Sequence, residues 1–137
     1  MATSRRTVGD LRDYWVDQMA FAHMDPAIPL YETQTWQTSG EDEEGALLYG
    51  NTTLMPGLVG DEFFMTRGHW HLKRSRGELC LTLSGEGAVL LMDDARKTWM
   101  EPMRPGSTHM IDGRLAHRTV NTGSEPLVFL CVHDSPP

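Results

Sequence analysis

Short runs of apolar residues, many alternating with polar ones, fill most of the chain after residue 30. A period of two is the pattern of a strand that buries one face. Turn-forming pairs such as Pro56-Gly57 and Pro105-Gly106 separate the runs. The pattern predicts strands over 31–37, 46–55, 61–67, 78–84, 86–93, 97–101, 107–111, 116–121 and 126–133. Many short strands with such turn signals favour an all-β sandwich or closed barrel.

The N-terminal segment has a different period. Apolar residues recur there at helical spacing: Val8, Leu11, Trp15 and Met19. Thr7, with Asp10 three residues on, has the arrangement of a helix cap. The sequence therefore predicts a helix over 7–20 whose apolar side chains, Trp15 and Met19 among them, pack against the domain. The predicted organisation is a helix and extended arm over 1–30 and a barrel over 31–137.

Size and charge narrow the class of protein. A chain of 137 residues fits one domain with a single core. The formal net charge is −7 and the one basic cluster is Lys73-Arg74-Ser75-Arg76, so nucleic acid is not an expected partner. No run approaches the roughly 18 apolar residues of a membrane span, and no apolar stretch follows the N-terminal arginines. We expect a cytoplasmic protein.

The two cysteines, Cys80 and Cys131, both lie in apolar alternating runs. Unpaired cysteine is among the most buried residue types, and the cytoplasm keeps thiols reduced. Buried free thiols are therefore the preferred interpretation, with a disulfide as the alternative.

A group of possible metal ligands stands out between residues 66 and 121. His69 and His71 are two apart on a predicted strand and so point to one face. Six residues then allow the chain to turn back, and Glu78 opens the next strand. His117, far along the chain, becomes a fourth ligand if the barrel closes. Three imidazoles and a carboxylate suit one divalent ion per chain: Fe(II) is the first choice, with Mn(II), Zn(II) or Ni(II) as alternatives.

These residues resemble the two cupin motifs. The first motif is His69-x-His71, then Glu78 and Gly85, and the second is His117-x-x-x-Asn121. Six residues separate His71 from Glu78, whereas the usual cupin motif has three or four. This spacing and the segments 62–71 and 116–126 resemble those of cupin-type phosphoglucose isomerases first known from archaea. The similarity covers about residues 46–133 and implies a cupin jelly-roll barrel.

The resemblance also implies an activity, the metal-dependent interconversion of glucose 6-phosphate and fructose 6-phosphate. Glu78 is then the base that moves a proton between the two carbons, with a hydride shift as the rival route. By position in the family, Thr52, Thr66 and Gly68 bind the substrate phosphate. Strand alternation predicts that Arg67 faces outward. The alternatives are another metal cupin enzyme, such as a dioxygenase or an isomerase of a different sugar, and a non-catalytic sugar-binding cupin.

The chain departs from the family pattern at several positions. Cys80 stands where the family has an active-site tyrosine. In the last strand, His133 stands where the family often has another tyrosine, and its imidazole is a candidate for binding a sugar hydroxyl. Asp112-Gly113-Arg114 replaces a proline-rich approach, and the sequence ends at Pro136-Pro137, where the family usually continues with a segment that contributes histidine and tyrosine. His109 is interpreted as structural or rim-facing. Because cupins commonly pair through strand edges and N-terminal arms, we expect a homodimer.

Overall fold

The computed structural model describes residues 1–38, 43–68 and 77–134. Nearly all of its regular structure is β-strand, which confirms the all-β prediction. Its strands are β1 Ala2–Thr7, β2 Pro29–Gln37, β3 Leu48–Leu54, β4 Leu58–Val59, β5 Glu62–Phe63, β6 Glu78–Ser84, β7 Gly87–Met92, β8 Thr98–Met103, β9 Thr108–Ile111, β10 Ala116–Asn121 and β11 Leu127–His133.

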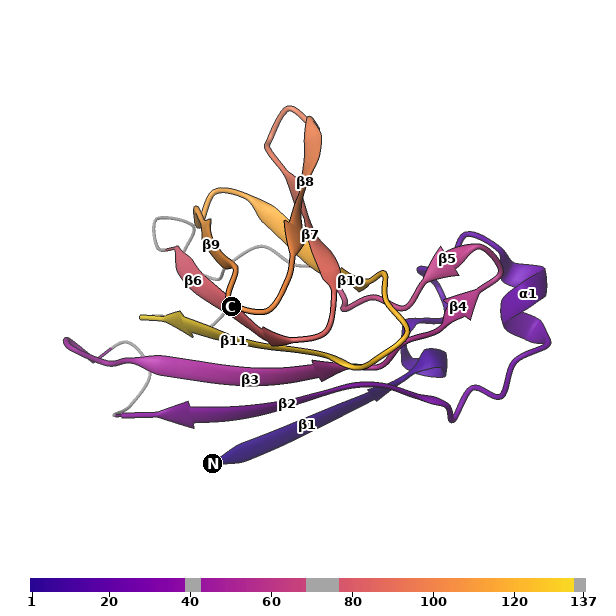
Figure 1. The fold of residues 1–137 in the computed structure, drawn as a ribbon, viewed down its shortest axis with the longest axis horizontal. Coiled ribbons are helices and arrows are strands. Elements are labelled where there is room, and N and C mark those ends of the chain that lie inside the picture. The colour runs from indigo at the N-terminus through magenta and orange to yellow at the C-terminus, as the bar shows by residue number, and fades with distance from the viewer. Residues whose placement is uncertain (39–42, 69–76, 135–137) are drawn as a thin grey trace.

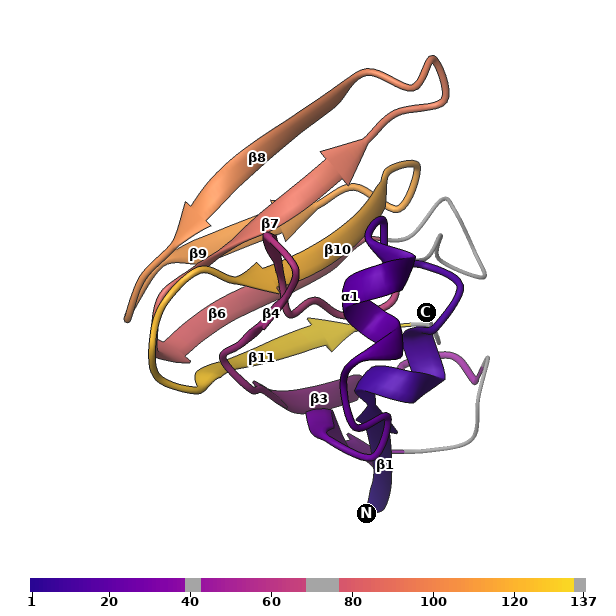
Figure 2. The ribbon, with the colours of Figure 1, turned by 90° about the vertical axis from the view of Figure 1, so that its right-hand side faces the viewer.

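Two antiparallel sheets form the body of the molecule. The larger sheet has the order β1-β2-β3-β11-β6-β9, and the smaller has the order β10-β7-β8. Figure 1 shows the large sheet below and the small sheet rising above it. Figure 2, turned by 90°, shows β7, β8 and β10 leaning over β3, β6 and β11, as expected for a two-sheet barrel. Interior side chains of both sheets meet between them.

Alternation located most strands closely. The predicted strands 78–84 and 116–121 agree with β6 and β10 at both ends. The predicted strand 61–67 is shorter than expected, because β5 covers two residues and pairs with β4 as a small hairpin. Its remainder contributes one isolated bridge, between Met65 and Val120.

The predicted helix over 7–20 is wrong. The chain instead forms β1, a 3₁₀ helix η1 over Val8–Leu11 and a short helix α1 over Gln18–Ala22. The expected cap does exist, since the backbone N–H of Thr7 donates to Asp10 at 2.8 Å. However, the backbone N–H of Val16, which a continuous helix would bond to the carbonyl of Arg12, donates instead to the Glu62 carboxylate at 3.0 Å. A tertiary contact has overridden the local pattern.

The edge strand β1 has no apolar alternation and was not predicted. All but its last residue are exposed. It is held by backbone pairing with β2, in a register that sets Ala2 opposite Thr35 and Arg6 opposite Tyr31. Pairing of this kind depends on backbone groups, so a hydrophobic pattern does not reveal it.

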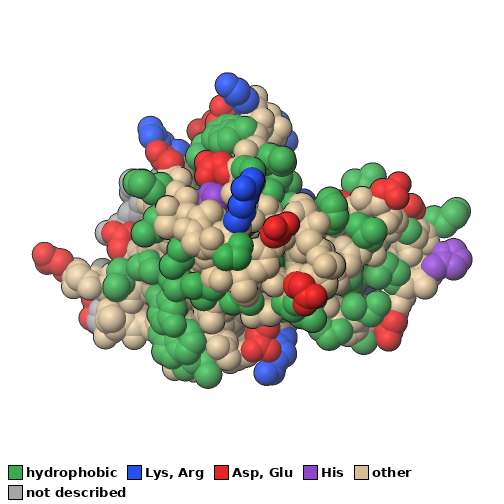
Figure 3. All heavy atoms as spheres, in the orientation of Figure 1, with side chains coloured by type: hydrophobic (Ala, Val, Ile, Leu, Met, Phe, Trp, Pro, Cys, Tyr) green, Lys and Arg blue, Asp and Glu red, His purple; other side chains and the backbone are tan. Residues whose placement is uncertain are grey.

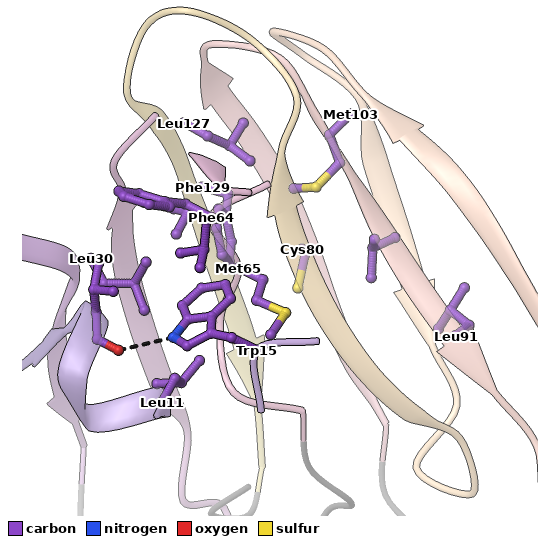
Figure 4. Close-up of a cluster of buried hydrophobic side chains, with 14 of the residues drawn as sticks. Leu11, Trp15, Leu30, Phe64, Met65, Cys80, Leu91, Met103, Leu127 and Phe129 are labelled. Atoms are coloured by element: carbon purple, nitrogen blue, oxygen red, sulfur yellow. Dashed lines mark hydrogen bonds between the residues drawn. The ribbon is translucent and has the colours of Figure 1, made fainter. Parts of the chain in front are cut away.

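The core cluster runs from the N-terminal segment into the space between the two sheets, where Val89 and Leu91 of β7 and Met103 of β8 join it. Figure 4 shows Leu11 and Trp15 beside Phe64, Met65 and Leu30. The indole N–H of Trp15 donates to the carbonyl of Val8 at 3.0 Å, which satisfies its one polar group. Burial of Trp15 was predicted, whereas the predicted packing of Met19 is wrong, because that side chain is 76% exposed.

Among the described residues on the face that Figure 3 shows, basic side chains are separate from one another and interspersed with acidic and hydrophobic ones. Among the described residues, no helix has both the length and the apolar character that a membrane crossing requires.

The prediction of free thiols is also wrong, since Cys80 and Cys131 form a disulfide. The two cysteines face each other on the adjacent antiparallel strands β6 and β11, with Cα atoms 4.1 Å apart. Both belong to the inward-facing set of their strands. The free-thiol prediction was based on the expected cytoplasmic location. The register of β11 on β6 instead places the two sulfur atoms within bonding distance.

Candidate active site

The central strand β6 carries the side chains on which the site is built. Glu78, Cys80 and Thr82 alternate with outward residues and all point into the barrel. The neighbouring strand β11 sets His133 opposite Glu78 and Cys131 opposite Cys80. Adjacent rows of the same sheet therefore place a carboxylate beside an imidazole and a sulfur beside a sulfur.

Glu78 and His117 meet across the barrel. His117 lies on β10 in the small sheet, opposite Leu91 of β7. Its Nε2 atom is 3.0 Å from Oε1 of Glu78, and the two side chains are only 7% and 5% exposed. A contact predicted from residues 39 positions apart in the sequence is thus formed between the two sheets. The other two predicted ligands, His69 and His71, lie outside the described residues.

The donor pair suits a metal ion by chemistry and by spacing. An imidazole nitrogen and a carboxylate oxygen are common ligands of divalent transition metals. Two such atoms, each about 2.1 Å from one ion and at right angles, lie roughly 3.0 Å apart. The distance between His117 and Glu78 has this value. The spacing is thus compatible with a mononuclear site, but it is equally that of a hydrogen bond between the two groups, so metal binding here stays a prediction.

The pair opens onto an interior cavity of about 250 Å³ between the sheets. Its walls combine hydroxyl, imidazole and sulfur groups with apolar side chains such as Val89 and Phe129. A mostly apolar cavity with a few converging polar groups is the usual form of a small-molecule site.

Three of the four predicted substrate-binding residues lie on this cavity: Thr52, Thr66 and His133. Thr52 exchanges a 3.0 Å hydrogen bond with Thr33, and the Thr66 hydroxyl accepts from the N–H of Thr119 at 3.0 Å. His133 is buried at the end of β11. Gly68 instead lines a neighbouring hollow, which His117 also borders. A side chain at Gly68 would press on the guanidinium of Arg118, 3.1 Å away.

Sequence reasoning missed part of the cavity wall. Tyr31, Thr33 and Thr35 project into it from alternate positions of β2. Their spacing of two was a usable signal, but hydroxyl residues on a strand also occur on solvent faces. Arg67 was predicted to face outward, but the residue borders the cavity. Its guanidinium lies 5.7 Å from the centroid of the Tyr14 ring.

His109 is buried and bonded on both sides of its ring, as a structural residue would be. Its Nδ1 lies 2.7 Å from Oε1 of Glu101, and its Nε2 lies 3.0 Å from the Ser107 hydroxyl. Ser107 in turn donates to Thr82 of β6 at 3.0 Å. This chain of contacts ties β8 and β9 to the strand that carries Glu78.

The loop before β10 carries the unusual Asp112-Gly113-Arg114. Arg114 donates to both carboxylate oxygens of Asp112, with its Nε 2.9 Å from Oδ1. Hydrogen bonds from this guanidinium hold the pKa of the Asp112 carboxyl well below its usual range. Both side chains are largely exposed, so the ion pair closes the loop on itself rather than adding charge to the cavity.

Solved structures with the same architecture support the fold. Oxalate decarboxylase from Bacillus subtilis aligns with a TM-score of 0.63 and 19% identity over 78% of this chain and 26% of its own. The enzyme from Lactobacillus farciminis aligns with a TM-score of 0.59 and 23% identity over 77% of this chain and 29% of its own. The B. subtilis structure is described as containing Mn(II) centres. At this identity the likeness establishes the cupin fold alone.

Sequence relatives are closer. The chain is 40% identical to glucose-6-phosphate isomerase of Thermococcus gammatolerans, covering 93% of this chain and 67% of the relative. It is 38% identical to that of Pyrococcus horikoshii, over 93% and 68%. A bacterial relative from Sinorhizobium medicae is 32% identical, over 88% and 57%. The family model of glucose-6-phosphate isomerase matches residues 5–136. The chain is therefore a member of the glucose-6-phosphate isomerase family, of the cupin type.

Proposed function

We propose that this protein is a metal-dependent glucose-6-phosphate isomerase that interconverts glucose 6-phosphate and fructose 6-phosphate in the cytoplasm, as a step of glycolysis and gluconeogenesis. The observation that carries the proposal is the buried contact of 3.0 Å between Glu78 and His117 at the cavity. A buried carboxylate and imidazole that face a mostly apolar cavity are suited to proton transfer beside a cation.

The proposed metal site consists of His69, His71, Glu78 and His117. When bound by these residues, a divalent ion would supply Lewis-acid stabilisation of negative charge on the substrate's carbonyl and hydroxyl oxygens. Fe(II) is the preferred ion in this proposal, with Mn(II), Zn(II) and Ni(II) as alternatives. The deep burial of His117 and Glu78 supports a bound cation of some kind, because a cation offsets the cost of keeping a charged carboxylate away from water.

Glu78 is the proposed base. Its carboxylate accepts the proton from one of the two reacting carbons and returns it to the other, while the sugar oxygens exchange their own proton. His133, the cross-strand neighbour of Glu78, is within the same wall and is proposed to hold a sugar hydroxyl. Thr52, Thr66 and Gly68 are proposed to hold the phosphate through hydroxyl and backbone N–H donors.

A coupled assay tests the proposal. Protein stripped with a chelator should lose turnover of fructose 6-phosphate and regain it with one of the four divalent ions. His117→Ala should remove at least about 99% of that regained activity, because metal ligands support affinity and rate together. Unphosphorylated fructose, assayed in parallel, should react far more slowly if the phosphate is recognised.

Metal binding without turnover would refute the isomerase assignment and leave a cupin of another activity. Consumption of oxygen by the Fe(II) form would then favour a dioxygenase. Stable binding of sugar without any reaction would favour a binding protein.

The proposal includes a homodimer. On the outer face of the large sheet, Leu79 lies between Val132 and Met110 in neighbouring strands. Leu79 and Met110 are 46% and 85% exposed, which makes this an apolar surface suited to burial against a second copy. Leu79→Asp should shift the protein to the monomer mass in sedimentation velocity. Leu58→Asp, at a similarly exposed leucine of β4, should not.

A further inference from the structure

Two sulfur atoms and a carboxylate converge on the cavity wall. Cys80 Sγ lies 3.4 Å from Oε1 of Glu78. Ligand atoms of Glu78, Cys80 and Cys131 all lie within 4.8 Å of one another. The proposed isomerisation employs the carboxylate but gives the sulfur atoms no role.

We propose that Cys80 and Cys131 form a reversible redox pair, and that their dithiol form, together with Glu78, binds a thiophilic divalent cation such as Zn(II). The disulfide form presents no thiolate and lacks this site. Oxidation state therefore decides which cation the cavity retains. The inference does not require isomerase activity, although it shares Glu78 with the proposed reaction.

The spacing fits such a site. Zinc lies about 2.3 Å from thiolate sulfur and about 2.1 Å from carboxylate oxygen. Tetrahedral angles then place the sulfur and oxygen atoms roughly 3.6 Å apart, and two sulfur atoms roughly 3.8 Å apart. The distance between Cys80 Sγ and Glu78 Oε1 is already close to the first value. The site requires the two sulfur atoms to separate toward the second value after reduction, by rotation about the Cα–Cβ bonds of Cys80 and Cys131.

The fourth position of a tetrahedral ion has two possible occupants, a water molecule and His117. The Nε2 atom of His117 is 3.0 Å from the same oxygen of Glu78. His109 sits opposite Cys80 on β9, but both of its ring nitrogens contact Glu101 or Ser107. His109 is therefore a neighbour of the sulfur pair and not one of its ligands.

Conversion between the two forms is ordinary thiol–disulfide exchange. The thiolate of a small-molecule thiol such as glutathione attacks one sulfur, the Cys80–Cys131 bond breaks, and a mixed disulfide forms. A second molecule of the thiol releases the protein sulfur. One protein disulfide and two thiols thus give two protein thiols and one small-molecule disulfide, a two-electron exchange. Binding of the cation then displaces the thiol protons to solvent.

Spectroscopic titration tests the inference without measuring turnover. Metal-free protein would be prepared as the disulfide with oxidised glutathione and as the dithiol with a reductant that is then removed. Co(II) bound by thiolate gives a sulfur-to-cobalt charge-transfer absorption, and the chain has only two cysteines that can produce it. We expect the absorption in the dithiol form alone. Zn(II) should displace Co(II) and bind the dithiol at least about tenfold more tightly than the disulfide.

Serine variants provide the matched controls. Cys131→Ser should retain a weaker absorption, whereas the double variant Cys80→Ser/Cys131→Ser should show none and should bind Zn(II) alike under both redox conditions. Absence of the absorption in the wild-type dithiol would overturn the metal site. Two free thiols persisting after treatment with oxidised glutathione, counted by mass after alkylation, would overturn the redox pair. Neither result would decide the proposed isomerase activity, because neither readout depends on catalysis.

Discussion

Replacing Glu78 with glutamine should lower kcat for fructose 6-phosphate by about 10²- to 10⁴-fold, the range over which a general base accelerates proton transfer. Glutamine keeps the size and one carbonyl oxygen, but it cannot accept the proton from carbon. Because the side chain is 5% exposed, solvent is poorly placed to replace it. The measurement is turnover per bound metal ion, with metal content determined on the same sample.

A matched control separates the loss of a base from the loss of a charge. Glu86→Gln removes one carboxylate from an exposed position on the turn before β7 and should leave kcat within about twofold of wild type. Full activity of metal-loaded Glu78→Gln would exclude the carboxylate as the base and would favour the hydride shift.

Substitution of Asn121 by alanine should reduce the free energy of unfolding by about 2–4 kcal/mol. Asn121 is fully buried at the end of β10. Its amide group donates to the carbonyls of Leu54 and Glu125, and its side-chain oxygen accepts from the N–H of Gly123. Alanine would leave these backbone groups without their partner and deprived of water. Urea unfolding followed by fluorescence of the four tryptophans gives the change directly.

Asn51 supplies the comparison for this prediction. Its side-chain oxygen is also buried, yet it accepts no hydrogen bond from any described residue. Asn51→Ala should therefore cost less than about 1 kcal/mol. Equal losses at both positions would show that side-chain volume, and not the hydrogen bonds of Asn121, sets the stability at these sites.

Side-chain alternation predicted the barrel strands because most of them bury one face, as β6 and β10 do. It failed where backbone contacts decide the structure. β1 is an exposed edge strand that pairs through its main chain, and the helical period over 7–20 was overridden where the N–H of Val16 donates to Glu62. Local pattern contains no information about either contact.

Part of the cavity wall was predictable in the same way. Motif spacing selected Glu78 and His117, and the fold brings these two side chains into contact, while their role as metal ligands stays a prediction. The hydroxyl wall of β2 escaped notice because Thr33 and Thr35 are ordinary strand residues until the opposite sheet is in place. Pairing of Cys80 with Cys131 required the register of β11 on β6, which is a long-range property of the fold.

That register has a consequence for anyone who would transplant the site. β6 carries Glu78, Cys80 and Thr82 on one face, flanked by β11 and β9. A slip of one residue would turn all three side chains outward and bring Leu79 and Leu81 inward in their place. The three side chains therefore keep their inward orientation only together. A graft into another barrel must therefore bring both flanking strands with it, because their pairing sets the register of β6.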